Sequence, residues 1–201
     1  DGQGWLLPGF DKYELDIVTI KQLQDEKIVA RDRYFPAKPM DVSTVRVKNT
    51  GDYNEKDLEE VCNKSFIVDE IVESYLEHNE GYKGIVFAVS IAHGERLRDS
   101  FLNHGIKCGL IHSKMKKFQI DYWLDAHRTG RIQLLVNVGM LIMGYDDINI
   151  IDMIDAQPTL SEKKQIQKWG RACRMDGERL GFARIFDYSG NTERHGYWCM
   201  E

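Results

Sequence analysis

Short apolar runs alternate with amphipathic stretches from about residue 66 onward, and this alternation restricts the possible fold more than any other feature. The apolar runs have the length of buried strands, and the stretches between them have the helical period. The expected strands are Ile85–Val89, Ile106–Ile111, Ile132–Val138, Ile148–Ile154 and Phe182–Phe186. The expected helices are Phe66–His78, Ala92–His104, Met115–His127 and Leu160–Arg174, with Gly105 and Gly130 as C-terminal stops.

Apolar strands separated by helices predict right-handed βαβ units, because parallel neighbours need a long crossover connection. Strands without polar alternation are buried on both faces, so helices should cover both sides of the sheet. The sequence therefore predicts an α/β fold with three layers and a mostly parallel sheet.

Residues 1–65 lack a clear period, and we expect them to form a lead-in arm or small subdomain ahead of a main domain over residues 66–201. The elements expected there are a short helix within Tyr13–Leu23, an extended loop over Tyr34–Pro39, a strand over Val42–Val47 and a helix over Asn54–Asn63. Asn54 is the expected N-cap of that last helix, since its side chain can accept from free backbone amides.

Charge is distributed unevenly along the 201 residues, whose formal net charge is −5. Residues 1–82 carry 10 Lys and Arg against 18 Asp and Glu, residues 83–174 carry 14 against 9, and residues 175–201 carry 3 against 5. The block with the strand–helix pattern is thus basic, with a net charge of +5. A basic block on an acidic chain is compatible with a polyanionic partner, although chance segregation would look the same.

Two classes of protein are disfavoured by composition. The 4 cysteines are far apart and form no CxxC pair, so the sequence predicts neither a metal site nor a disulfide framework. No apolar run is long enough to cross a bilayer, so we expect no membrane partner and a cytoplasmic location.

The last predicted helix presents a notable polar face. Thr159 followed by Glu162 has the spacing of a capping box, which predicts a start near Leu160. Ile166, Trp169 and Cys173 should share the buried face. The other face carries Gln167, Arg171 and Arg174. Gly170 lies between the two faces and has no side chain, so another surface can approach the helix closely there. Two guanidiniums beside a glycine suit a phosphate chain, and the alternative is a solvated basic face.

Polar or small residues follow the predicted strands, where ligands bind in parallel sheets. They are Ser90 and His93 after the first strand, His112 after the second, Asn137, Val138 and Gly139 at the end of the third, and Gly144 and Asp146 in the loop beyond it. The alternatives are that Ser90 is only a helix cap, that His112 is a packed histidine and that Gly144 to Asp146 is an ordinary turn.

The usual primary phosphate sites are missing from this sequence. It contains neither GxxxxGK[ST] nor GxGxxG, and no DExx tetrad follows an apolar strand. A chain with arginines for a phosphate but no phosphate loop is consistent with the second half of a composite site.

Three stretches in this order resemble superfamily-two helicases of the DEAD/DEAH type, in particular phage and prophage helicases and repair or restriction translocases. The stretch from Gly84 to His93 resembles their motif IV, and the stretch from Leu134 to Asp146 resembles motif V. The stretch from Gln167 to Arg174 matches the motif VI pattern QxxGRxxR at every fixed position. The resemblance extends over residues 66–196 and implies a RecA-like domain.

Several roles are implied by this resemblance alone. ATP would bind between this domain and an N-terminal RecA-like domain of the same protein, which would hold the phosphate loop and most of the magnesium site. Arg174 would be the arginine finger, Arg171 a second phosphate contact and Gln167 a nucleotide sensor. Gly144, Asp146 and Gly170 would lie near the nucleotide. The residues expected to contact nucleic acid, DNA rather than RNA, are Ser90, His93, His112, Asn137, Val138 and Gly139.

This sequence departs from the family pattern at three positions. Motif V usually carries Thr-Asp where this chain has Val138 and Gly139, Ile148 replaces a common proline, and Gln157 replaces a common arginine. We expect the fragment alone to be inactive as an ATPase. A stand-alone nucleic-acid-binding module remains an alternative, as does an unrelated doubly wound enzyme with a small anionic substrate.

Overall fold

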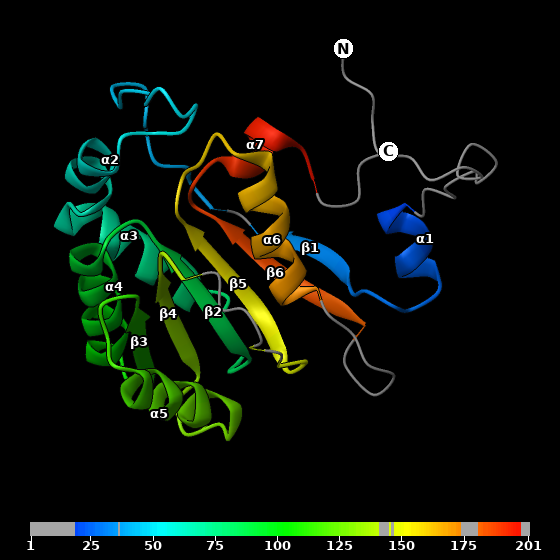
Figure 1. Cartoon of the computed structure of the whole chain (residues 1–201). Helices are drawn as coiled ribbons and strands as arrows, with labels where there is room; N and C mark the ends of the chain where they lie inside the picture. The colour runs from blue at the N-terminus through cyan, green and yellow to red at the C-terminus, as the bar shows by residue number, and fades with distance from the viewer. Residues whose placement is uncertain (1–18, 36, 141–144, 146, 174–180, 198–201) are drawn as a thin grey trace, which may run out of the picture.

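A six-stranded parallel sheet forms the centre of the computed structural model (Figure 1). The structure describes residues 19–35, 37–140, 145, 147–173 and 181–197. The strand order is β1-β6-β5-β2-β4-β3, and every neighbouring pair is parallel. The strands are β1 (Arg31–Phe35), β2 (Lys83–Ala88), β3 (Cys108–His112), β4 (Leu134–Val138), β5 (Ile150–Ala156) and β6 (Phe182–Asp187).

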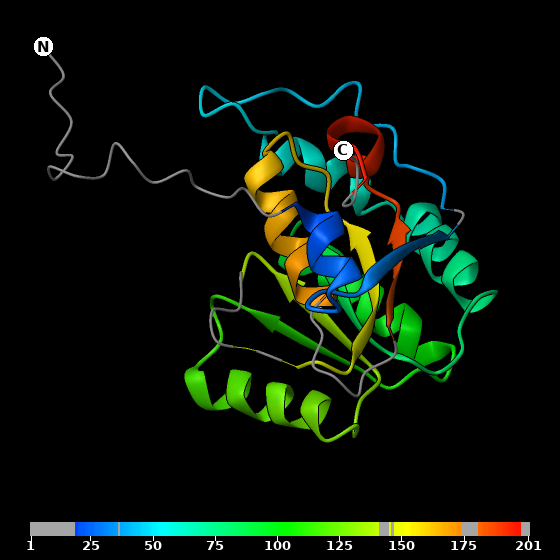
Figure 2. The same ribbon diagram turned by 90° about the vertical axis from the view of Figure 1, so that its right-hand side faces the viewer.

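Helices pack on both faces of this sheet (Figures 1 and 2). They are α1 (Ile20–Asp25), α2 (Glu55–Cys62), α3 (Ser65–Leu76), α4 (Ile91–Asn103), α5 (Lys117–Arg128), α6 (Glu162–Ala172) and α7 (Asn191–His195). Buried side chains of α2, α3 and α4 join one apolar cluster with alternate residues of the strands, and those of α5 and α6 join a second cluster on the opposite face. The predicted three-layer α/β fold is confirmed.

The elements predicted after residue 66 are confirmed with shifts of a few residues at their ends. Buried strands read as apolar runs in the sequence, and the observed strands β2 to β6 are buried over most of their lengths. Gly105 and Gly130 have φ of 81° and 74°, which supports their expected role as helix stops. No helix among the described residues is long and apolar enough to span a membrane.

The lead-in region differs from its prediction in two places. Residues Arg31–Phe35 form β1, which pairs with β6 in parallel and extends the sheet, whereas the sequence indicated only an extended loop from Tyr34. The strand predicted over Val42–Val47 is wrong: an isolated bridge joins Val47 to Tyr53, and Val42 and Val45 pack into the core from a turn instead. The boundary at residue 65 stays a prediction.

Two helix starts in this region can be compared with the sequence. Asn54 caps α2 as predicted, because its side chain accepts from the backbone amides of Lys56 and Asp57. α1 overlaps the end of the helix predicted within Tyr13–Leu23, whose first residues lie outside the described part of the chain.

The predicted start and buried face of α6 need correction. Ser161 is the N-cap and its side chain accepts from the amide of Lys164, so the helix begins at Glu162 rather than near Leu160. Thr159 instead donates its hydroxyl to Asp52. Trp169 and Cys173 are buried as predicted, but Ile166 is 45% exposed and its expected place is taken by Gln165 and Lys168. Polar side chains are buried there because each has a partner, which hydrophobic periodicity cannot show.

Candidate nucleotide and nucleic-acid sites

The C-terminal half of α6 holds the described part of the arginine-bearing face. Gln167 is exposed and Arg171 is partly buried. Arg171 donates from its guanidinium to the carbonyl of Tyr145 at 3.4 Å, which joins α6 to the loop after β4. A methyl group added at Gly170 would meet no atom of the described residues within 4 Å. Arg174, Gly144 and Asp146 lie outside the described residues.

Tyr145 is held in place by a buried polar group at the start of β2. Its hydroxyl lies 2.6 Å from Nδ1 of His127, whose Nε2 lies 3.0 Å from the carbonyl of Gly84. A carbonyl oxygen only accepts, so Nε2 must carry the hydrogen and Nδ1 must accept the tyrosine proton. Burial lowers the pKa of His127 to about 4, aided by nearby Lys83, so the imidazole stays neutral.

The same group includes an ion pair that fixes the loop before β5. Lys83 donates to Asp147 at 2.9 Å and to the carbonyl of Arg128 at 3.0 Å. The second oxygen of Asp147 accepts from the backbone and side chain of Asn149. Burial raises the pKa of Asp147, but Lys83 and the Asn149 amide outweigh it and lower the pKa. These contacts anchor the loop on which the predicted nucleotide residues lie.

The residues predicted to contact nucleic acid gather at the carboxyl edge of three adjacent strands. Ala88 of β2, Val138 of β4 and His112 of β3 stand at one register level. Ser90 caps α4 by accepting from the amide of His93, and Gly139 is exposed with φ of 64°. This edge therefore brings together residues that are far apart in the sequence.

His93 does not face solvent at this edge. Its ring is fully buried, and Nδ1 accepts from the amide of Val89 at 3.3 Å. Burial lowers the pKa of His93 to about 3, so it is a neutral core histidine. It supports the turn between β2 and α4 from the inside.

A cavity of about 300 Å³ opens beside the same edge, between the ends of β2, β4 and β5 and the first half of α6. Asn137 lies in its wall with 3% exposure, and its Oδ1 has no hydrogen-bond partner among the described residues. The lining also includes Gly139 and a loop from the lead-in region. The full lining is Asp52, Tyr53, Glu55, Leu58, Phe87, Val89, Asn137, Gly139, Met140, Gln157, Pro158, Thr159, Lys164 and Lys168.

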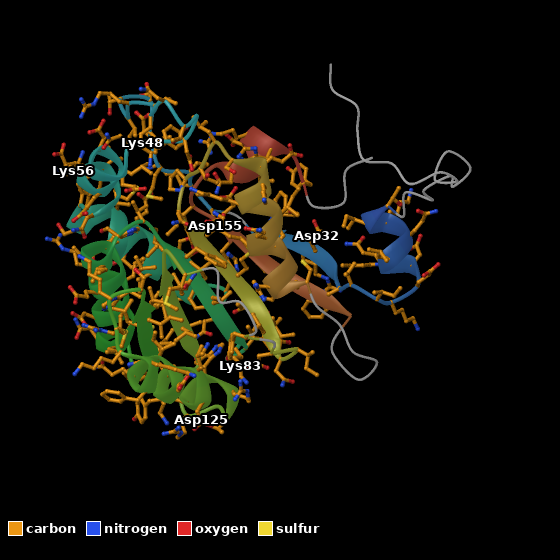
Figure 3. All side chains as sticks on the ribbon, viewed as in Figure 1. Asp32, Lys48, Lys56, Lys83, Asp125 and Asp155 are labelled. Atoms are coloured by element: carbon orange, nitrogen blue, oxygen red, sulfur yellow. The ribbon has the colours of Figure 1, made fainter. Side chains whose placement is uncertain are left out.

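A buried lysine closes the floor of this cavity. Lys168 donates to both oxygens of Asp155 at 2.8 Å and to the carbonyl of Gln157 at 2.9 Å. Asn191 of α7 donates to Asp155 and to the same carbonyl. Figure 3 shows Asp155 beside α6, and it shows Lys83 at the other end of the sheet. The cavity and the Lys83 group are thus separate places on the domain.

Asp52 closes the cavity from the lead-in side. Its carboxylate accepts from the amide of Leu160 at 2.9 Å, from the hydroxyl of Thr159 and from the ammonium of Lys164 at 2.7 Å. Burial acts to raise the pKa of Asp52, but Lys164 and the backbone donors lower it to about 2. Sequence analysis missed Asp52, Asp155 and Lys168, and no local signal could have found them, since each acts through a partner distant in the chain.

The fit of the implied ligands can be tested against these groups. An added methyl group at Gly170 meets no described atom within 4 Å, and the guanidinium of Arg171 beside it is a group that suits a phosphate. Among the described residues no group of three His, Cys, Asp or Glu could hold a metal ion.

Comparisons with known proteins agree with this fold and these motifs. The model of the helicase conserved C-terminal domain matches residues 65–176, which is more than half of the chain. The chain belongs to this family, and its fold is the RecA-like fold of helicase C-terminal domains.

Three similar proteins indicate the range of the family. A 51.5 kDa protein of a Lactococcus phage is 29% identical over 92% of this chain and 40% of its own length. A Saccharomyces cerevisiae protein named for ATP-dependent helicase activity, IRC3, is 26% identical over 85% of this chain and 25% of its own length. The C-terminal domain of the DEAD-box protein Dbp5 is 18% identical, with a TM-score of 0.55 over 84% of this chain and 82% of that one. The chain thus spans less than half of the two sequence relatives.

Proposed function

We propose that this chain is the second motor domain of an ATP-dependent helicase or translocase that acts on nucleic acid, most naturally DNA. Family membership over residues 65–176, together with the arginine face of α6, carries the proposal. The N-terminal RecA-like domain of the same protein would hold ATP, with magnesium held mainly there. This chain would close over the nucleotide and form part of the track.

Arg171 and Arg174 are the residues that would act on the nucleotide. The transition state of phosphoryl transfer spreads negative charge over the γ-phosphate oxygens, and a guanidinium from a facing domain stabilises that charge. The contact between Arg171 and the Tyr145 carbonyl supports this role, because it links the arginine face to the anchored loop. Arg174 is proposed as the finger and Arg171 as a second contact, with Gln167 positioning the nucleotide.

The nucleic-acid strand would cross the carboxyl edge of the sheet. Ser90, His112 and the residues from Asn137 to Gly139 meet there, within the block of residues that is net positive. Because such contacts are mainly to phosphates, binding would weaken as salt rises and would depend little on sequence. Closure of the two domains would then tie hydrolysis to movement along the strand.

The test is the DNA-stimulated ATPase rate of this chain alone and of a longer polypeptide that includes the N-terminal motor domain. We expect activity only in the longer polypeptide. There, Arg174→Ala should lower the turnover rate by roughly 10³-fold or more, as loss of an arginine finger does, and leave DNA binding nearly unchanged. Arg98→Ala on α4 is the matched control, since α4 covers the opposite face from α6.

Each other outcome has a definite meaning. Unchanged turnover in Arg174→Ala would overturn the finger assignment. Activity in the short chain would mean that it holds a complete phosphate site. An inactive longer polypeptide that still binds DNA in a salt-dependent way would favour the stand-alone binding module.

A further inference from the structure

We propose that the cavity beside Asn137 receives one unstacked nucleobase of the bound strand. This proposal rests on the proposed function and goes beyond it, because it assigns a base contact to an edge where only backbone contacts were expected. The cavity is about 300 Å³, the lower end of the range for small-molecule sites. It can hold a single planar ring system and cannot hold a stacked strand.

Charge pairing in the lining argues against a phosphate as the occupant. The ammonium of Lys168 has three hydrogens, and Asp155 and the Gln157 carbonyl accept at three positions. Lys164 is paired with Asp52 at 2.7 Å, and Glu55 is paired with Lys48 at 3.0 Å. Every charged side chain in the lining therefore has an opposite partner, so the cavity suits a neutral ligand.

Asn137 requires a ligand that can donate a hydrogen bond. Its Oδ1 is buried, no group in the described part of the chain donates to it, and leaving such an acceptor unpaired is costly. A phosphodiester has only acceptor oxygens and cannot supply the missing hydrogen. Amino groups and ring N–H groups of nucleobases can supply it, and the side-chain amide of Asn pairs well with adenine through one donor and one acceptor.

The apolar part of the lining complements the faces of a base. Phe87 is the register partner of Asn137 on the neighbouring strand, so both side chains point to the same side of the sheet. Tyr53 and Leu58 approach from the lead-in region, on the other side of the opening. A planar ring with polar edges is the ligand shape that such mixed walls favour.

The strand is the favoured source of this base, rather than the nucleotide of the motor. Gly139 lines the cavity and lies at the edge where the strand would run. Lys164 of the lining and Arg171 of the nucleotide face are seven residues apart on α6, about 10 Å along the helix axis. A base entering the cavity from the strand needs no displacement of the nucleotide.

The first test compares two oligonucleotides of equal length and phosphate number at low salt. One is oligo(dA), and the other is an abasic oligomer that keeps every sugar and phosphate. We expect this chain to bind oligo(dA) about tenfold more tightly than the abasic oligomer, and Asn137→Leu to reduce that ratio of affinities to about twofold. Asn103→Leu, the same change at an exposed site at the end of α4, should keep the full preference.

The second test follows the side-chain amide signals of Asn137 by NMR, so it does not depend on a variant that folds. Adenosine should shift these signals and ribose 5-phosphate should not. Equal affinity for the two oligonucleotides would overturn the base site and leave the motor assignment standing. No strand binding at all would overturn both the base site and the proposed track, and a shift with adenosine alone would then assign the cavity to a free nucleoside.

Discussion

Lys168 and Asp155 form a fully buried ion pair, with 2% and 0% of their side chains exposed and the ammonium 2.8 Å from both carboxylate oxygens. The pair joins α6 to β5 directly beneath the cavity. Burial of two charges costs free energy, which offsets much of their attraction, so the ion pair adds little net stability. Its three short hydrogen bonds do fix the position of Lys168 relative to β5. It holds the middle of α6 at a set position on the sheet.

Removal of the lysine should therefore be costly. Lys168→Met should lower the free energy of unfolding by about 3–5 kcal/mol, because it leaves the Asp155 carboxylate buried without its cation. Urea unfolding at neutral pH measures the change. Lys163→Met, at an exposed position on the same helix, should cost less than about 0.5 kcal/mol. Equal effects of the two changes would mean that the pair is not fixed as described.

Asp52 should stabilise the start of α6 in a pH-dependent manner. Its folded-state pKa of about 2 lies below its ordinary value of 3.8, so its contribution is present above the ordinary pKa and is lost as pH falls toward 2. Asp52→Asn should thus be less stable than the unmodified chain at pH 6, and the difference should shrink between pH 4 and pH 2. Thermal unfolding across this range measures it, and a constant difference would contradict the ion-pair contribution.

His127 should make the fold sensitive to mild acid. Burial lowers its pKa to about 4 from 6.5, so between these values the unfolded chain binds more protons at this residue, and stability falls as pH falls. The loss should be on the order of 3 kcal/mol between pH 7 and pH 4. Denaturant unfolding of the unmodified chain and of His127→Gln isolates this contribution as the difference between the two curves.

Other buried groups make that comparison necessary. Burial raises the pKa of Asp152 to about 6, which favours the folded state as pH falls from 6 to 4 and so opposes His127. The low pKa of His93 acts in the same direction as His127. Both groups are retained in His127→Gln, so they cancel in the difference. If the two curves stay parallel from pH 7 to pH 4, His127 does not titrate as described.

The layers of the fold could be predicted from sequence because strands β2 to β6 are buried over most of their lengths and read as apolar runs. β1 could not, since three of its five residues are charged and it lies at the edge of the sheet, where one side stays open. The valines that suggested a strand over Val42–Val47 include Val42 and Val45, which are apolar because they pack against the core from a turn and not because they form a strand.

Site residues could be predicted where they belong to a local sequence motif. They could not be predicted where their role depends on a contact with a residue distant in the sequence. Asn137 and Gly139 were found because they end a predicted strand, and the structure places them at the expected edge. The cavity itself was not foreseen, because Asp52 reaches Leu160 across 108 residues. Buried Lys168 likewise looks like any surface lysine until Asp155 is placed beside it.

Gly170 offers a test that separates stability from function. A methyl group at this position meets none of the described atoms within 4 Å, and alanine favours a helix interior over glycine by about 0.5–1 kcal/mol. Gly170→Ala should therefore raise the free energy of unfolding slightly. In the longer polypeptide the same change should slow ATP hydrolysis, since the methyl group would occupy the surface beside Arg171 that the phosphate chain is proposed to approach.

The two readouts of Gly170→Ala must move in opposite directions if that surface is the nucleotide face. Calorimetry of this chain gives the first, and the steady-state ATPase rate of the longer polypeptide gives the second. A variant that is more stable and equally active would place the nucleotide elsewhere, because the added methyl group would then have no effect on the ATPase rate. A variant that is less stable would show instead that the gap beside α6 is closed by the rest of the protein.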